Sequence, residues 1–134
     1  MCLGVGPGLA AVDRLAETTP AAGVRVDVRW LGELRPLPTE IDVSAYRIIQ
    51  EALTNVVRHA GTASCGVSVD CRADELAIEV IDAGRGHGST PDGGYGLIGM
   101  RERVGLRRGE FSAAPRPEGG FRVAARLPVP AGVR

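Results

Sequence analysis

Three polar side chains that could take part in phosphate chemistry occur at helical spacing in an otherwise apolar segment of this chain. Glu51, Asn55 and His59 stand at positions i, i+4 and i+8, which places them on one face of an α-helix. An amide oxygen is a hard ligand that suits Mg²⁺, and a carboxylate one turn away can position or deprotonate a nucleophile. A solvated helix face would give the same pattern, but the neighbouring Ile48 and Ala52 are apolar. This polar stripe therefore indicates magnesium–phosphate chemistry.

A second candidate group lies at the end of a segment of alternating polarity. Asp82 has the same parity as Ile78 and Val80, so its carboxylate should point inward. A buried carboxylate is costly unless another group bonds to it. Asp82 is therefore either a turn-forming residue or an acceptor for the amino group of a purine. Gly84 and Gly86 follow, and a backbone without Cβ atoms allows a ligand to approach closely.

A second glycine-rich segment, residues 93–100, leads into a predicted helix. The free N–H groups at a helix N-terminus favour phosphate, so this segment could contact a phosphate group. It is not a Rossmann fingerprint, because no parallel strand–helix–strand unit surrounds it. It also lacks the Gly-Lys-Ser/Thr ending of a P-loop.

Periodicity predicts the elements that must position these groups. Helices are expected over about 7–19, 42–60 and 97–107, and strands over about 24–30, 63–71, 76–82, 110–113 and 121–127. The residues of the long helix expected to face the core are Tyr46, Ile49, Leu53, Val56, Val57 and Ala60. Alternating strands imply a sheet with one solvated face, and the few helices must cover the other. The predicted fold is α+β, a two-layer sandwich with a mixed, mostly antiparallel sheet.

Composition limits the class of protein. Residues 1–134 are expected to form a single domain, with flexible ends at about 1–6 and 130–134. Sixteen basic residues balance sixteen acidic ones and only 4% of residues are aromatic, which argues against a nucleic-acid-binding module. No apolar run approaches the roughly 20 residues of a membrane span. We therefore expect a cytoplasmic domain, which leaves open a parent protein anchored in a membrane.

Three cysteines, Cys2, Cys65 and Cys71, do not make a complete disulfide framework. Cys65 and Cys71 lie in one predicted strand, roughly 20 Å apart at about 3.3 Å per residue, so they cannot pair without breaking it. They are expected to be reduced, buried, small apolar residues.

Taken in order, these segments resemble the GHKL ATPase family. Residues 46–60 resemble its N box, 82–86 its first glycine box, 94–103 its second and 119–128 its closing strand. Two motifs, Glu-Ala-Leu-Thr-Asn at 51–55 and Gly-Leu-Ile-Gly-Met-Arg-Glu-Arg at 96–103, resemble those of the ATP-binding catalytic domain of bacterial sensor histidine kinases, in particular the nitrate-sensor class.

The resemblance implies the Bergerat fold, with ATP held between the helical layer and a lid over about 87–94. Position by position, Glu51 would be the catalytic carboxylate and Asn55 the Mg²⁺ ligand. Arg58 and His59 would approach the phosphates. Asp82 would accept a hydrogen bond from the adenine amino group.

The glycines and the helix start complete the implied site. The residues expected to shape the pocket or contact the phosphates are Gly84, Gly86, Gly94, Gly96 and Leu97. Two positions depart from the family pattern: Ala83 stands where many relatives have Asp or Asn, and Phe121 stands where many have Thr.

The implied function is Mg²⁺- and ATP-dependent phosphoryl transfer to a histidine on a separate dimerisation segment, because neither His59 nor His87 fits the family's acceptor. The implied partners are ATP, the dimerisation and phosphoacceptor helices of a parent kinase and, indirectly, a response regulator. The domain alone is expected to be monomeric. Three alternatives remain at this stage: an anti-sigma-type serine kinase of the same fold, a non-catalytic nucleotide-sensing module, and an interaction module that binds no nucleotide.

Overall fold

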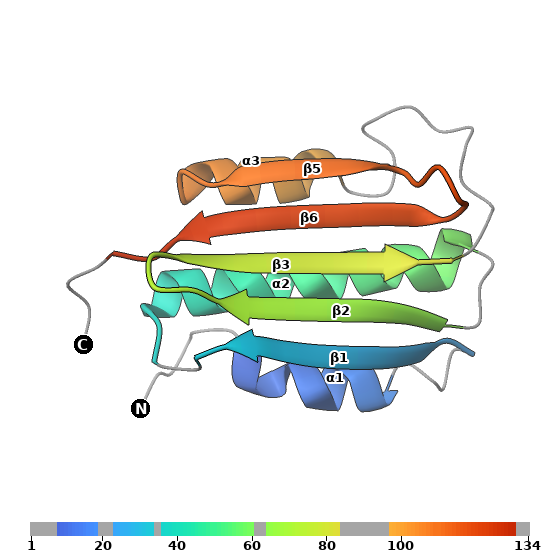
Figure 1. Ribbon diagram of the computed structural model, residues 1–134, viewed down its shortest axis with the longest axis horizontal. Helices are drawn as coiled ribbons and strands as arrows, with labels where there is room; N and C mark the ends of the chain where they lie inside the picture. The colour runs from blue at the N-terminus through green and yellow to red at the C-terminus, as the bar shows by residue number, and fades with distance from the viewer. Residues whose placement is uncertain (1–7, 19–22, 34–35, 61–63, 84–96, 131–134) are drawn as a thin grey trace.

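The protein is built of two layers, a sheet and a set of helices packed on one of its faces (Figure 1). A computed structural model describes residues 8–18, 23–33, 36–60, 64–83 and 97–130, excluding the side chains of residues 59 and 60. The described helical segments are η1 (Leu9–Ala11), α1 (Val12–Thr18), α2 (Thr39–Asn55) with its π-helical continuation η3 (Val56–Ala60), and α3 (Leu97–Leu106). The described strands are β1 (Arg25–Gly32), β2 (Ser64–Cys71), β3 (Glu75–Asp82), β5 (Glu110–Pro115) and β6 (Phe121–Pro128).

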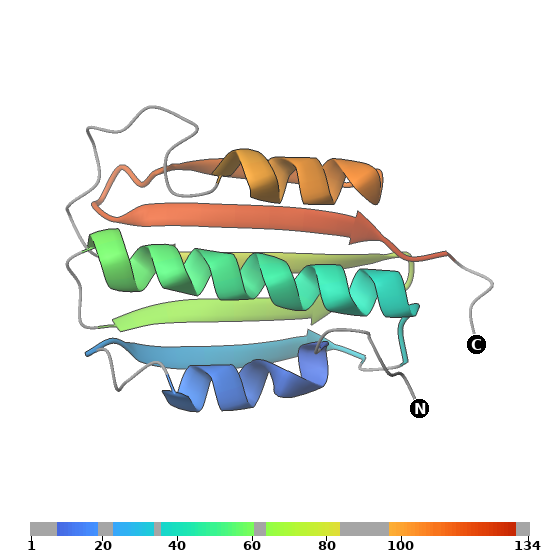
Figure 2. The same ribbon diagram turned by 180° about the vertical axis from the view of Figure 1, so that it is seen from behind.

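The sheet has five strands in the order β1-β2-β3-β6-β5. β1 and β2 are parallel, and the other three pairs are antiparallel. The parallel pair arises because α2 lies between β1 and β2 in the chain and returns it across the sheet, as a crossover connection must. Figure 2 shows α1, α2 and α3 side by side on the same face. The predicted α+β fold with a mixed, mostly antiparallel sheet is confirmed.

Strict alternation of burial in β2 and β3 directs every second side chain towards the helices. Cys65, Val67, Val69 and Cys71 are buried in β2, and Leu76, Ile78, Val80 and Asp82 are buried in β3. Both described cysteines are free thiols, as expected. The parity of the sequence therefore predicted the inner face of β2 and β3 correctly, including the carboxylate of Asp82 on it.

The opposite face of the sheet carries paired charges. Arg122 bonds to Glu79 on the neighbouring strand, and Arg72 bonds to Asp70 and Glu75 at 3.0 and 2.9 Å. Because these groups are largely exposed, each pair contributes little stability and mainly keeps the face soluble in water. Among the described residues, none of the helices combines the length and apolar character needed to span a bilayer.

The long helix packs against the sheet with seven buried residues: Ile41, Ala45, Tyr46, Ile48, Ile49, Ala52 and Leu53. Val56 continues this face at 5% exposure, but Val57 is 37% exposed, so the expectation that it faces the core is wrong. The physical reason is its angular position: Val56 lies at the centre of the buried face, and Val57, about 100° further around the helix, lies at the edge of this face.

Two adjacent valines give a direct test of this helix packing. Val56→Ala removes two buried methyl groups and should lower the free energy of unfolding by about 2 kcal/mol, because it deletes buried apolar surface. Val57→Ala is the matched control, because it makes the same change of helix propensity at an exposed position, and it should cost about 0.5 kcal/mol or less. Urea unfolding of both variants measures the difference, and equal losses would contradict the assigned packing.

Candidate functional site

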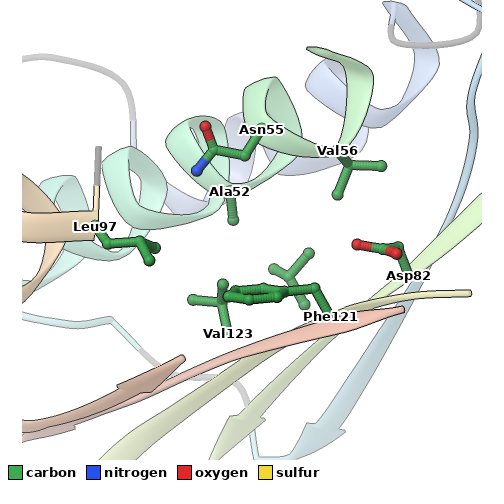
Figure 3. A pocket seen from close by; sticks show the side chains of 8 residues that line it. Ala52, Asn55, Val56, Asp82, Leu97, Phe121 and Val123 are labelled. Atoms are coloured by element: carbon green, nitrogen blue, oxygen red, sulfur yellow. The ribbon is translucent and has the colours of Figure 1, made fainter. Parts of the chain in front are cut away.

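A narrow cavity of about 20 Å³ lies between the end of α2, the start of α3 and the strands β3 and β6. Its lining residues are Ala52, Asn55, Val56, Val80, Asp82, Leu97, Phe121 and Val123. In Figure 3 the α2 side chains stand opposite Asp82, Phe121 and Val123 of the sheet, with Leu97 at one side. This volume has room for about one water molecule and is far below the roughly 300–1,000 Å³ of small-molecule pockets. The cavity therefore has the location of a ligand site, between the helical layer and the sheet, and a flat group could enter only if the residues around it move apart.

Asp82 supplies the negative charge of this cavity. It is the last residue of β3 and is 3% exposed. Within the described part of the chain, it is the one polar or charged residue that is buried. It is paired across the sheet with Cys65 on one side and Phe121 on the other. A carboxylate held in this way can accept hydrogen bonds but cannot donate them while it is ionised. The site therefore selects for a ligand with N–H or O–H donors.

Asn55 lies where the regular helix ends. It is the last residue of α2, and the π-helical turn begins at the next residue, whose N–H donates to the carbonyl groups of Ala52 and Leu53. Such turns are rare and occur frequently at functional sites. Asn55 is partly buried and lines the cavity, so it lies at the boundary between the apolar pocket and solvent.

Leu97 fixes the start of α3 at the edge of the cavity. It is 7% exposed, and the next two buried residues of this helix, Met100 and Val104, are 0% and 1% exposed. The spacing of these three residues forms one apolar face that anchors α3 against the sheet. The N-terminus of α3 is therefore held next to the cavity.

The structure brings three of the predicted site residues together, Asn55, Asp82 and Leu97. Glu51 is partly buried on α2, one turn before Asn55, and Arg58 is exposed in the π-helical turn. Neither is among the residues that line the cavity. The side chain of His59, the glycines 84, 86, 94 and 96, and the expected lid over 87–94 lie outside the described residues.

Apart from Leu97, the apolar residues of the cavity were not predicted as site residues. Val80 and Val123 fit ordinary core positions of half-buried strands, and Phe121 was noted only as a departure from the family pattern. Val80 lies two residues before Asp82 in β3, and Phe121 is its cross-strand partner. Their relation to Asp82 by parity and pairing is the signal that could have identified them, but strand pairing is not visible in a single sequence.

The environment of Asp82 also affects its neighbour on β2. Burial, the negative charge of Asp82 and that of Asp27, in this order, raise the pKa of the Cys65 thiol from 9.0 to about 12. Burial raises the pKa because the thiolate would have to be desolvated. Cys65 is therefore a protonated, unreactive thiol in the folded domain at neutral pH.

The fold and the cavity define a two-layer α+β domain with a small, mostly apolar pocket that contains one carboxylate. The family model described as "Histidine kinase-, DNA gyrase B-, and HSP90-like ATPase" matches residues 40–131. The chain belongs to this family. The matched residues include α2 and the strands and helix that surround the cavity.

The relatives of the chain are sensor histidine kinases. It is 28% identical to the signal transduction histidine-protein kinase/phosphatase DegS of Brevibacillus brevis, over 80% of this chain and 28% of that protein. It is 31% identical to the sensor histidine kinase LnrJ of Bacillus subtilis, over 78% of this chain and 26% of that protein. The chain thus spans about a quarter of the length of these relatives.

A solved structure agrees with this assignment. The blue-light activated histidine kinase EL346 of Erythrobacter litoralis is similar with a TM-score of 0.70 and 25% identity, over 92% of this chain and 42% of that one. The chain is therefore an ATPase domain of the histidine kinase type. The narrower resemblance to the nitrate-sensor class stays a prediction.

The raised pKa of Cys65 predicts a loss of stability at alkaline pH. The folded state keeps the thiol proton in a range where the unfolded chain releases it, so the stabilisation is complete below about pH 9 and is lost as the pH rises towards 12. Between about pH 8 and about pH 10.5, the wild type should lose more unfolding free energy than Cys65→Ala does. Asp82→Asn should recover part of this loss, because it removes one of the charges that raise the pKa. Equal losses of unfolding free energy in wild type and Cys65→Ala over this pH range would contradict the raised pKa of Cys65.

Proposed function

We propose that this domain binds ATP with Mg²⁺ in the cavity beside Asp82 and acts as the ATP-binding catalytic domain of a two-component sensor histidine kinase. The observation that carries the proposal is the buried carboxylate of Asp82 inside an apolar cavity, 3% exposed. Membership of an ATPase family whose members include histidine kinases supports the same ligand.

Adenine fits the chemistry of this cavity. Its exocyclic amino group is a donor that the Asp82 carboxylate can accept, whereas guanine has an acceptor oxygen at that position, which the carboxylate would repel. The flat base would pack between Ala52 and Val56 of α2 and the strand residues Val123 and Phe121. Phe121 contributes an aromatic surface in place of the threonine hydroxyl of many relatives. Selectivity for adenine would therefore rest mainly on Asp82.

The triphosphate would extend from the cavity past Asn55 towards the start of α3. Within the described residues no cluster of three His, Cys, Asp or Glu side chains could hold a metal ion. Mg²⁺ is often held by few protein ligands together with substrate phosphates. The amide oxygen of Asn55 would be its ligand from α2, and Arg58, His59 and the glycines 84, 86, 94 and 96 would contact the phosphates. Bound Mg²⁺ would neutralise charge on the transferring phosphoryl group.

Glu51 is the proposed catalytic carboxylate. It lies one helical turn before Asn55 and is only partly buried, so it can act on a group that arrives from outside the cavity. Its role would be to orient the incoming histidine of the acceptor segment and to take up its proton. Most of the catalysis would come from positioning and charge neutralisation, because phosphoryl transfer needs little covalent help from the protein.

The acceptor histidine would belong to the dimerisation and phosphoacceptor helices of a parent kinase, which would pass the phosphoryl group to a response regulator. We expect the domain to be cytoplasmic and, in isolation, monomeric, with little activity of its own. A serine kinase of the anti-sigma type and a non-catalytic nucleotide sensor are not favoured, because the most similar proteins described above are sensor histidine kinases.

Calorimetric titration with ATP and Mg²⁺ tests the binding site. Asp82→Ala should weaken ATP binding about 10- to 100-fold, because a hydrogen bond to a charged group is lost in a buried place. Asn55→Ala should weaken binding about tenfold with Mg²⁺ present and much less in its absence. Asp74→Ala is the control, since it removes an exposed carboxylate from the turn between β2 and β3 and should leave the affinity unchanged. Full affinity in both site variants would refute the site.

The catalytic role of Glu51 requires an acceptor supplied separately. When the parent kinase's acceptor helices are added to the domain, Glu51→Gln should reduce the rate of histidine phosphorylation about 100-fold or more, the range expected for loss of a general base. ATP affinity should stay close to that of the wild type. A phosphorylation assay with labelled ATP measures the rate, and equal rates for both proteins would favour a role for the domain in nucleotide sensing alone.

A further inference from the structure

The turn between β5 and β6 contacts the backbone of Asp82 from a distant part of the sequence. The Nη1 atom of Arg116 donates a hydrogen bond to the Asp82 carbonyl oxygen at 3.0 Å, in a partly buried position. The two residues are 34 positions apart in the chain. A guanidinium bond to a carbonyl group is charge-assisted and is stronger than a bond between neutral groups. The carbonyl at the end of β3 is therefore held by a specific, long-range contact.

The backbone of the same turn lies against the same carbonyl. Gly120 has a φ of +90°, and a Cβ atom at this position would lie 2.0 Å from the Asp82 carbonyl oxygen. Only glycine fits here, because another residue would clash with the backbone of β3 and would also be strained by the positive φ. Two independent features of the turn, the side chain of Arg116 and the backbone of Gly120, thus converge on one peptide group.

Arg116 is itself fixed by the turn. Its backbone N–H donates to the carbonyl of Gly120 at 2.9 Å, and its own carbonyl accepts from the N–H of Gly119 at 3.0 Å. Its Nη2 atom pairs with Glu118 at 3.2 Å, and the Arg116 side chain is 24% exposed. Because the turn fixes its backbone and Glu118 pairs with its guanidinium, Arg116 loses less freedom when it binds the Asp82 carbonyl.

The location of the contact matters because β3 ends at Asp82. Pairing with β2 and β6 orders the strand up to this residue, and the peptide group that follows leads out of the sheet. The orientation of that peptide group sets the backbone angle ψ of Asp82. Once it is fixed, only the two side-chain torsions of Asp82 remain free to move the carboxylate in the cavity.

We propose that Arg116 is a positioning residue for nucleotide selection, which holds the Asp82 carboxylate in place for the amino group of the base by anchoring the Asp82 carbonyl. The inference deepens the proposed function and rests on it. Arg116 does not line the cavity. Its effect should therefore appear in the discrimination between bases and not in general affinity for triphosphates.

The test compares ATP with purine riboside triphosphate, which differs from ATP only in lacking the exocyclic amino group. In calorimetric titrations, Arg116→Ala should weaken ATP binding about tenfold, because it removes a charge-assisted hydrogen bond that supports the acceptor. Binding of purine riboside triphosphate should change less than about twofold. Arg116→Lys keeps one charged donor but not the planar group, so it should restore part of the preference for ATP.

Two control variants separate this role from a general loss of charge or stability. Arg122→Ala removes an arginine of the neighbouring strand that pairs with Glu79 on the other face of the sheet, and it should leave the preference for ATP intact. Glu118→Gln removes the exposed ion partner of Arg116 but keeps its bond to Asp82, and it should behave like the wild type. If Arg116→Ala weakens the binding of both triphosphates equally, or of neither, the proposal is wrong.

A second measurement without nucleotide separates failure of this inference from failure of the proposed function. The backbone amide of Ala83 belongs to the peptide group whose carbonyl Arg116 holds, so its NMR resonance should shift in Arg116→Ala and stay in place in Arg122→Ala. An unchanged Ala83 resonance would refute the anchoring by Arg116 and would leave the proposed ATP site untouched. If the wild type binds both triphosphates equally or binds neither, the proposed adenine site fails, and the selective role of Arg116 fails with it.

Discussion

Asp82 places a carboxylate at the end of a central strand, 3% exposed, among side chains that are nearly all apolar. Transferring such a charge from water costs several kcal/mol unless hydrogen bonds compensate. The negative charge of Asp82 also acts on the neighbouring strand, where it adds to burial in raising the pKa of Cys65. A ligand with an amino group that reaches this carboxylate would gain affinity and specificity from the same interaction.

Four parts of the fold surround or hold Asp82: α2, α3, β6 and the turn before β6. The crossover through α2 brings Ala52, Asn55 and Val56 over the sheet, and the buried face of α3 fixes Leu97 at the edge. β6 supplies Phe121 as the direct partner of Asp82, and the turn before β6 holds the Asp82 carbonyl through Arg116. The helical layer and the sheet thus meet around Asp82 at one end of the sheet, where β3 ends and α3 begins.

Much of this arrangement could be predicted from the sequence, because it follows from local periodicity. Two-residue alternation predicted the inward direction of Asp82 and Cys65, and helical spacing placed Asn55 one turn after Glu51 on the same helix face. The exposure of Val57 was missed because it lies at the edge of the apolar stripe, where helical spacing alone does not separate buried from exposed positions. The pairing of Phe121 with Asp82 and the contact of Arg116 could not be predicted, because they depend on strand register and on a contact between distant residues.

A crystal structure of the domain with Mg²⁺ and a non-hydrolysable ATP analogue would test the central claim most directly. The account predicts that the adenine ring lies between α2 and the β3–β6 strands, with its amino nitrogen within about 3 Å of a carboxylate oxygen of Asp82. It also predicts that the amide oxygen of Asn55 coordinates Mg²⁺ at about 2.1 Å. A base bound elsewhere, or an Asp82 carboxylate without contact to the amino group, would contradict the account.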